Sequence, residues 1–305
     1  MTQPRTKRDF LAIPDFTRDE LFALFELAAR MKSGDYTEKP LAGKTLAMIF
    51  AKSSTRTRVS FEVGVRELGG DVMFLSAAEI QLGRGEPIKD TARVMGRMLH
   101  GAIIRTFAQQ DVVDFAHYSG IPTINALTDD EHPCQIVADL QTMREKLGSL
   151  EGKTVTFVGD GACNVPVSLA WAAARLGFDL RIAAPAAYRP SAALLARLGP
   201  RVSVTSDLAA AACGADVLYT DVWVSMGKED EAEFRIAQLG GYQIDAGLVA
   251  RAKPGALVMH CLPAYRGKEI TDETFEQHAA TIFEQAENRL HAQKAILSLL
   301  ATPTA

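Results

Sequence analysis

The sequence is poor in cysteine and in aromatic residues, and it has no strong excess of charge of either sign. Four cysteines occur in 305 residues, far apart and without a C-x-x-C pair, and aromatic residues make up 7%. This cysteine pattern excludes a disulfide framework and a zinc ribbon, and it predicts a reduced, cytoplasmic protein. The net charge of -4 is built from both signs spread along the chain. We therefore expect neither a nucleic-acid partner nor an anionic membrane surface.

Long apolar runs are also absent. No stretch approaches the length of a membrane-spanning helix. The first eight residues carry basic side chains with no apolar segment behind them, which is unlike a signal peptide. Hydrophobic residues still make up 48% of the chain, and 305 residues are enough for two domains of ordinary size. These totals predict a packed two-domain protein.

Apolar runs of strand length alternate with stretches of helical spacing along the whole chain. The expected strands are 45–50, 71–75, 101–105, 121–124, 154–158, 179–183, 202–204, 216–220 and 256–260. The expected helices are 19–31, 87–99, 111–119, 133–147, 166–176 and 286–300, with a further one that carries Phe61, Val65 and Leu68 and stops at Gly69-Gly70. The pattern pauses around 148–153 and then restarts, which predicts a domain boundary between 1–148 and 149–286. Alternation of this kind is typical of the α/β class, here two Rossmann-like domains, each a parallel sheet flanked by helices.

One short polar stretch, Ser53-Ser54-Thr55-Arg56-Thr57-Arg58, lies between an apolar strand and an amphipathic helix. The first N–H groups of a helix lack backbone partners and carry partial positive charge, so such a turn binds anions, phosphate in particular. Two arginines add bidentate donors for phosphate oxygens, and no acidic residue nearby in sequence neutralises them. A solvated polar turn with a basic surface patch is the alternative interpretation.

Further polar residues follow the ends of other expected strands, where ligands of parallel sheets bind. Arg105 ends an apolar run, and His132-Pro133-Cys134-Gln135 opens a helix as either a capping turn or a pair of donors to a carbonyl oxygen. Asp221 either caps a turn or binds an ammonium group. His260-Cys261 is either a metal pair, although no third and fourth ligand are apparent nearby, or part of a loop whose backbone and thiol contact substrate.

The Gly159-x-Gly161-x-x-Asn164 segment resembles a dinucleotide fingerprint only weakly. Asn164 replaces the third glycine, and the next strand ends in Ala183-Ala184-Pro185, without an acid for a ribose. Asn164 therefore either caps a helix or faces the crevice and binds a polar substrate. A two-domain dehydrogenase remains the rival class, and a non-catalytic anion sensor is a third.

Taken together, these segments resemble the carbamoyltransferases. Ser54-Thr55-Arg56-Thr57-Arg58 and His132-Pro133-x-Gln135 look like the two carbamoyl-phosphate signatures of that family. Three further segments narrow the resemblance to its ornithine branch: Asp221-x-Trp223-x-Ser225-Met226-Gly227, His260-Cys261-Leu262-Pro263 and Glu287-Asn288-Arg289. The chain departs from the family at Cys163, where relatives often carry asparagine, and at Val222, where threonine is usual.

The resemblance implies transfer of the carbamoyl group of carbamoyl phosphate to L-ornithine, giving L-citrulline and phosphate in arginine metabolism, with no cofactor and no metal. It implies that the carbamoyl-phosphate site consists of Ser54, Thr55, Arg56, Thr57, Gln81, Arg105, His132, Gln135, Cys261, Leu262 and Arg289. It implies that ornithine is bound by Asn164, Asp221, Ser225 and Met226, and that Arg105, His132, Cys261 and Asp221 are catalytic. It also implies a homotrimer in which Gln81 reaches a neighbour's site, and a C-terminal helix, 287–301, that folds back onto the first domain. Within this class another acceptor amine, such as putrescine or an acylated ornithine, is the alternative to free ornithine.

Overall fold

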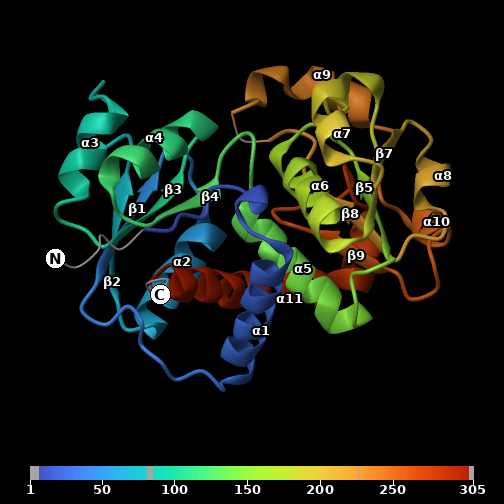
Figure 1. Ribbon diagram of the computed structural model, residues 1–305. Helices are drawn as coiled ribbons and strands as arrows, with labels where there is room; N and C mark the ends of the chain where they lie inside the picture. The colour runs from blue at the N-terminus through green and yellow to red at the C-terminus, as the bar shows by residue number, and fades with distance from the viewer. Residues whose placement is uncertain (1–6, 81–84, 226, 302–305) are drawn as a thin grey trace. The chain divides into compact units, whose positions relative to one another are not determined.

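The computed structural model of the chain describes residues 7–80, 85–225 and 227–301. The chain forms two compact units, Met1–Gln141 with Asn288–Ala305, and Thr142–Glu287. Each unit contains one parallel sheet, a four-stranded one of order β2-β1-β3-β4 and a five-stranded one of order β7-β6-β5-β8-β9 (Figure 1). The α/β class with two parallel sheets flanked by helices, predicted from the alternating pattern, is thereby confirmed.

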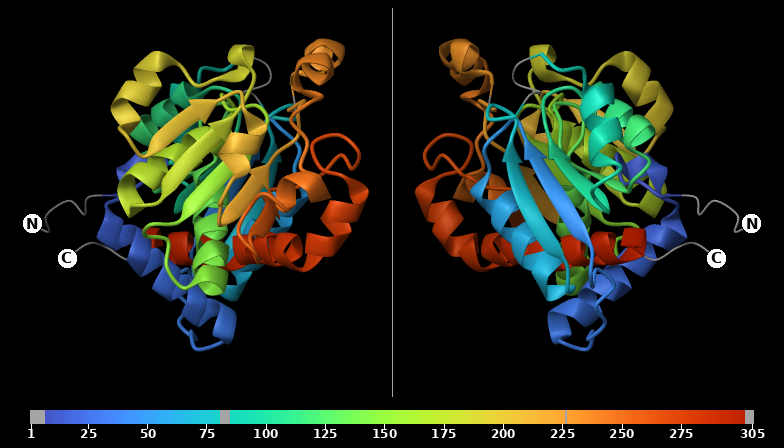
Figure 2. Two further views of the ribbon diagram at one scale, coloured as in Figure 1. Left: turned by 90° about the vertical axis from the view of Figure 1, so that its right-hand side faces the viewer. Right: turned by 90° about the vertical axis from the view of Figure 1, so that its left-hand side faces the viewer.

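The elements of the first unit match the expected alternation. Its strands are β1 (Thr45–Phe50), β2 (Asp71–Ser76), β3 (Gly101–Arg105) and β4 (Thr123–Leu127), and its helices are α1 (Arg18–Ser33), α2 (Thr55–Glu67), α3 (Ile88–Met95), α4 (Gln109–Ser119) and the start of α5 (Pro133–Leu147). The strands run side by side in the same direction, as the right-hand view of Figure 2 shows. Parallel strands buried on both faces read as continuous apolar runs, which is why 45–50 was recognisable.

Helices cover both faces of this first sheet. On one face, Ala47 and Ile104 pack against Ala92 of α3 and Phe115 of α4. On the other, α2 approaches the C-terminal helix so closely that a Cβ at Gly64 would lie 3.1 Å from the Lys294 side chain. The small residue therefore allows these two helices to pack, and the expected contact of the C-terminal helix with the first domain is confirmed.

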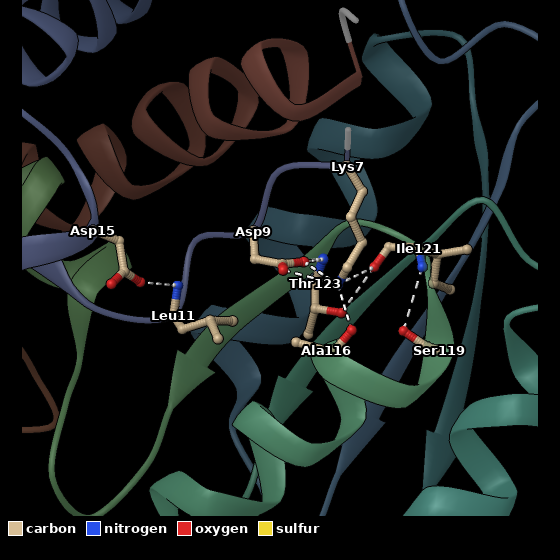
Figure 3. A network of polar contacts seen from close by, with 8 residues as sticks. All are labelled: Lys7, Asp9, Leu11, Asp15, Ala116, Ser119, Ile121 and Thr123. Atoms are coloured by element: carbon tan, nitrogen blue, oxygen red, sulfur yellow. Dashed lines mark hydrogen bonds and ion pairs between the residues drawn. The ribbon is translucent and has the colours of Figure 1, made fainter. Parts of the chain in front are cut away.

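The N-terminal segment extends the first sheet beyond β4. Phe10 donates its N–H to the Thr123 carbonyl at 2.9 Å and accepts the Asn125 N–H at 2.8 Å. Asp9 accepts the Thr123 N–H at 2.9 Å and pairs with Lys7, whose ammonium also donates to the Ala116 carbonyl (Figure 3). An edge strand exposes unpaired backbone groups, and this segment covers them.

We expect Asp9→Ala to destabilise the first unit. The substitution leaves the Thr123 N–H without its acceptor and the half-buried Lys7 ammonium without its counter-ion, a loss of about 1–3 kcal/mol. Urea unfolding followed by circular dichroism measures the difference. Asp19→Ala, on the exposed first turn of α1, is the control and should change the free energy of unfolding by less than about 0.5 kcal/mol. Equal effects of the two substitutions would contradict the role of this anchor.

The second unit repeats the alternation with five strands. Its strands are β5 (Thr154–Val158), β6 (Asp179–Ala183), β7 (Val202–Thr205), β8 (Val217–Thr220) and β9 (Leu257–His260), and its helices are α6 (Asn164–Leu176), α7 (Ala192–Leu198), α8 (Leu208–Ala212), α9 (Ala232–Leu239) and α10 (Ala246–Val249). Leu218 and Val258 pack against Ala212 of α8 and Leu248 of α10 on one face of the sheet.

Helix α11 (Asp272–Ala301) begins fourteen residues before the helix expected at 286–300. Its first half packs in the second unit, where Phe275 and Ile282 join the core, and its last turns belong to the first unit. The two halves of the helix pack in different units, and the sequence pattern indicated only the second half. Although α11 has 30 residues, neither it nor another helix in the described ranges is long and apolar enough to cross a membrane.

Two other predicted bounds were wrong for local reasons. The helix expected at 87–99 ends as α3 at Met95, after which the Arg97 and Met98 N–H groups bond to the carbonyls three residues back, in turns. Residue 96 must be glycine, because a Cβ there would lie 1.8 Å from the Ser119 carbonyl oxygen. The strand expected at 121–124 begins only at Thr123, after Pro122, which has no N–H for a ladder.

Candidate active site

The expected anion turn joins the end of β1 to the start of α2. Ser54 is the N-cap, and its hydroxyl oxygen accepts the Thr57 N–H at 3.2 Å. Thr55 is the first helical residue and is exposed, Arg56 is half-buried, and Thr57 is buried. A helix N-terminus with hydroxyls and a guanidinium around it is suited to bind the dianionic end of a phosphate ester or anhydride.

Arg58 does not take part in this turn as the sequence suggested. Its guanidinium lies 3.9 Å above the Phe74 ring, and its Nε lies 3.6 Å from Glu62. Glu62 is four residues further along the same helix, so the expectation that no nearby acid neutralises these arginines was wrong for Arg58. Arg56 is the arginine left for the anion.

Arg289 joins three distant segments of the first unit. It lies on α11 and is buried, and it donates one N–H to the Thr57 hydroxyl at 3.0 Å and another to the Gln135 side-chain oxygen at 2.6 Å. Gln135 in turn donates to Asp139 at 2.8 Å, so its amide is held in one orientation. The structure thus brings together Thr57, Gln135 and Arg289, as the resemblance implied.

His132 and Arg105 belong to the same positively charged region. Arg105 ends β3 and is buried, and the register between β3 and β4 shifts between Ile104 and Arg105. Burial lowers the pKa of His132 well below 6.5, and the charges of Arg289 and Arg105 lower this pKa further. The imidazole is therefore neutral near pH 7 and can donate an N–H to a carbonyl oxygen without carrying a charge.

This lowered pKa predicts a pH-dependent loss of stability. Below about pH 6.5 the unfolded chain protonates this histidine and the folded chain does not, so the unfolded state binds more protons and stability falls as the pH falls. Between pH 7 and pH 5.5 one such group contributes about 1 kcal/mol. His132→Gln should lose that much less stability over this interval in urea titrations. An identical pH dependence in the two proteins would contradict the prediction.

Lys52 is a site residue that was not predicted. It precedes the anion turn, is 5% exposed, forms an ion pair with Asp129 and lies 4.3 Å from the centre of the Phe107 ring. This ion pair connects the turn after β1, which contains Lys52, with the loop before His132, which contains Asp129. The sequence did contain a signal for Lys52, because a lysine lies directly between the expected strand at 45–50 and the expected anion turn.

The second unit gathers a different set of polar groups at the ends of β5, β8 and β9. Asp221 follows β8, and its carboxylate accepts the Val222 N–H at 2.7 Å. Burial raises the pKa of Asp221, against the opposing effects of the hydrogen bonds that its carboxylate accepts from the Cys261 thiol and from that N–H. A half-buried carboxylate at this edge can bind an ammonium group, the role that the resemblance implied.

Asn164 opens α6 as its first helical residue, while Cys163 occupies the N-cap position without a side-chain bond. The capping interpretation of Asn164 was therefore wrong. Burial raises the pKa of the Cys163 thiol, and so do the charges of Asp160 and Asp221. The start of α6 is thus electrostatically coupled to Asp221.

The two glycines before α6 have a packing explanation. A Cβ at Gly161 would lie 2.4 Å from the Ile182 side chain, and Gly159 has a φ of 128°. The turn therefore needs glycine to pass close to β6, whether or not a ligand is bound.

Asp221, His260 and Cys261 have ligand atoms within 4.8 Å of one another, so the fold supplies the third metal ligand that was not apparent in sequence. Both His260 nitrogens are engaged, Nδ1 with the Leu262 N–H at 2.9 Å and Nε2 with Glu269 at 3.0 Å. A metal ion would have to displace one of these bonds.

Other predicted residues lie in loops. Ser225 is half-buried, and Lys228 donates its N–H to the Ser225 carbonyl at 3.0 Å. Leu262 follows Cys261 in the turn after β9. Gln81 and Met226 lie outside the described residues.

Comparison with known proteins divides the chain into two domains of one family. Residues 8–145 match the family model described as aspartate/ornithine carbamoyltransferase, carbamoyl-P binding domain, and residues 151–300 match the Asp/Orn binding domain of the same family. The chain is 54% identical over 298 residues to an ornithine carbamoyltransferase of Akkermansia muciniphila, covering 96% of this chain and 98% of the relative. It is 51% identical to the ornithine carbamoyltransferase of Symbiobacterium thermophilum over 304 residues, covering 96% and 97%.

Solved structures agree with these relatives. The ornithine carbamoyltransferase of Pyrococcus furiosus superposes with a TM-score of 0.90 at 44% identity, covering 98% of both chains. An anabolic ornithine carbamoyltransferase of Campylobacter jejuni superposes with a TM-score of 0.91 at 42% identity, covering 96% of this chain and 98% of the other. With both halves of the chain matched in order, and with the residues of both signatures placed as described, this chain belongs to the aspartate/ornithine carbamoyltransferase family.

Proposed function

We propose that the protein is an ornithine carbamoyltransferase (EC 2.1.3.3), which transfers the carbamoyl group of carbamoyl phosphate to the δ-amine of L-ornithine and releases L-citrulline and phosphate in arginine biosynthesis. The observation that carries this proposal is the bonding of Arg289 to Thr57 and Gln135. It unites both carbamoyl-phosphate signatures with the C-terminal helix in a family whose ornithine branch is about half identical to this chain.

In this proposal the first unit binds carbamoyl phosphate. Ser54, Thr55, Arg56 and Thr57 hold the phosphate, and Arg105, His132 and Gln135 hold the carbamoyl group. Arg289 and the backbone of Cys261 and Leu262 complete the pocket. We assign the carbamoyl-phosphate domain to 1–148 and the ornithine domain to 149–286, with 287–301 returning to the first.

Ornithine is assigned to the second unit, through Asn164, Asp221, Ser225 and Met226. The nucleophile is the neutral δ-amine, which is about one molecule in a thousand near pH 7 for a pKa of roughly 10, a cost of about 4 kcal/mol. Binding the neutral δ-amine near the Cys261 thiol, in a site closed to water, lessens that cost, while the Asp221 carboxylate binds the α-ammonium group of ornithine. The Cys261 thiol is polarised toward the Asp221 carboxylate, to which it donates a hydrogen bond.

Attack on the carbamoyl carbon moves charge onto the carbonyl oxygen. Neutral His132, together with Arg105 and Thr57, provides donors for that oxygen in a region already excluded from water, which is worth several kcal/mol when the donors are fixed in advance. The departing phosphate oxygen is the closest base for the amine proton, so no separate general base is required.

Two finer features also belong to the proposal. We propose a homotrimer in which Gln81 of one chain reaches a neighbour's site, and a cytoplasmic location. The proposal of a cytoplasmic location rests on the sequence pattern of four widely spaced cysteines without a C-x-x-C pair. Sedimentation equilibrium should give three times the 33.0 kDa chain mass.

A colorimetric ureido assay of the purified protein tests the reaction directly. Carbamoyl phosphate is supplied with L-ornithine, putrescine or an N-acylated ornithine in parallel. We expect product with ornithine at least 100-fold faster than with the other two amines, because an α-amino acid head needs partners such as Asp221. Preference for another amine would overturn the substrate assignment. Binding of a nicotinamide cofactor without ureido product would favour the dehydrogenase class.

A further inference from the structure

A fully buried pair of side chains lies behind the turn that follows β9 in the second unit. His260 and Glu269 are both 0% exposed, and His260 Nε2 lies 3.0 Å from Glu269 Oε1. The same carboxylate oxygen accepts the Tyr265 N–H at 2.6 Å. Burial of a carboxylate and an imidazole is costly unless hydrogen bonds satisfy them, so a specific arrangement is maintained here.

The hydrogen bonds determine the state of the imidazole. The Leu262 N–H donates to His260 Nδ1 at 2.9 Å, and an N–H can donate only to an unprotonated ring nitrogen. Nε2 therefore carries the single ring proton, and its N–H donates a hydrogen bond to Glu269. The ring is neutral, and the acid fixes both its tautomer and its orientation.

The residue that this imidazole supports has an unfavourable backbone. Leu262 has a φ of 62° and is the one non-glycine residue with positive φ among those described. For such a residue the left-handed conformation costs about 1–2 kcal/mol, and it persists only when its surroundings hold it. The bond from the Leu262 N–H to His260 supplies that restraint. His260 is itself anchored through its backbone N–H, which donates to the Gln285 side chain at 3.0 Å.

We propose that His260 and Glu269 are positioning residues of the carbamoyl transfer, which hold the Cys261–Leu262 backbone in the conformation that receives the carbamoyl group. Glu269 orients His260, His260 restrains Leu262, and the Cys261 thiol and Asp221 carboxylate lie beside them. The inference rests on the proposed function, and it adds two residues that have no assigned contact with either substrate.

Two substitutions of His260 separate this role from simple structural support. A glutamine amide reaches the place of Nε2 and keeps a donor for Glu269, but it leaves the Leu262 N–H without an acceptor. An asparagine amide reaches the place of Nδ1 and keeps that acceptor, but it leaves Glu269 buried without its imidazole. We therefore expect His260→Asn to be the less stable protein and His260→Gln the less active one.

Steady-state kinetics with ornithine and carbamoyl phosphate rank the variants by activity, and urea unfolding ranks them by stability. His260→Gln should lower kcat about 100-fold and change the carbamoyl-phosphate KM less than about fivefold, because the first unit still holds the phosphate. His260→Asn should keep kcat within about tenfold of the unsubstituted protein. Glu269→Gln, whose amide oxygen still accepts the imidazole N–H, should retain kcat within about fivefold.

Thr156→Val is the matched control. Its hydroxyl donates to the Ala211 carbonyl at 2.7 Å on the same sheet and is equally buried, so its loss should lower stability and leave kcat unchanged. If kcat follows stability across the four variants, or if His260→Gln keeps full kcat, the proposal is overturned. Should His260→Asn not fold, the comparison of His260→Gln with Thr156→Val decides alone.

Failure of the proposed function can be distinguished from failure of the proposed role of His260. If the unsubstituted protein forms no ureido product with any amine, the reaction is wrong. The restraint is then tested by the crystal structure of His260→Gln, in which φ of Leu262 should leave the left-handed region. A left-handed Leu262 in that variant would contradict the restraint itself.

Discussion

Arg56→Ala is expected to abolish measurable binding of carbamoyl phosphate. The side chain is half-buried at the second position of α2, next to a helix N-terminus that favours anions. A guanidinium that donates two charge-assisted hydrogen bonds to phosphate contributes about 1.5–3 kcal/mol for each, so its loss should weaken binding by roughly two to four orders of magnitude. Titration calorimetry with carbamoyl phosphate measures this loss.

Arg58→Ala is the control for this experiment. It removes the same charge two residues further along the same helix, from a side chain that is 50% exposed, stacked on Phe74 and paired with Glu62. Its affinity should stay within about threefold of that of the unsubstituted protein. Equal losses for the two arginines would mean that net charge rather than geometry binds the phosphate, and the description of the anion turn would be wrong.

Asp221→Asn is expected to raise the ornithine KM about 30- to 1000-fold while the carbamoyl-phosphate KM changes little. The change is isosteric, and the amide oxygen can still accept the Val222 N–H, so the loss is that of a charge opposite the substrate ammonium. Removing one partner of a buried charge pair costs about 2–4 kcal/mol. Steady-state kinetics with each substrate varied in turn measure both constants.

Two comparisons sharpen this prediction. Asp245→Asn, at the N-cap of α10 in the same unit, makes the same chemical change where asparagine caps equally well, and both KM values should be unchanged. In the unsubstituted protein the ornithine KM should rise as the pH falls, because protonation of Asp221 removes its charge. Burial raises the pKa of Asp221, so this rise should begin at a higher pH than the one at which an ordinary aspartate is protonated. Equal shifts in both KM values for Asp221→Asn would refute the assignment of ornithine to this carboxylate.

Much of the fold was predictable because its signals are local. The strand at 45–50 is one apolar run with a polar turn after it, and β1 begins and ends at the expected residues. The contact of Arg289 with Thr57 and Gln135 was predictable only through the family resemblance. Those residues are up to 232 positions apart, and no periodicity links them.

The parts that were missed depend on tertiary contacts. The partner of Arg58 was overlooked because it lies one helical turn away rather than adjacent in sequence. The nearness of Asp221 to His260 and Cys261 arises from the pairing of β8 with β9, which only the sheet order reveals. The early start of α11 was hidden because its two halves contribute to different cores.

That division of α11 has a consequence for synthesis on the ribosome. Residues 288–305 belong to the unit formed by the first 141 residues, and Arg289 from this last helix completes its polar centre. The nascent first unit therefore cannot form the bonds from Arg289 to Thr57 and Gln135 when its own strands emerge from the exit tunnel. These bonds form only after the whole intervening unit has been translated.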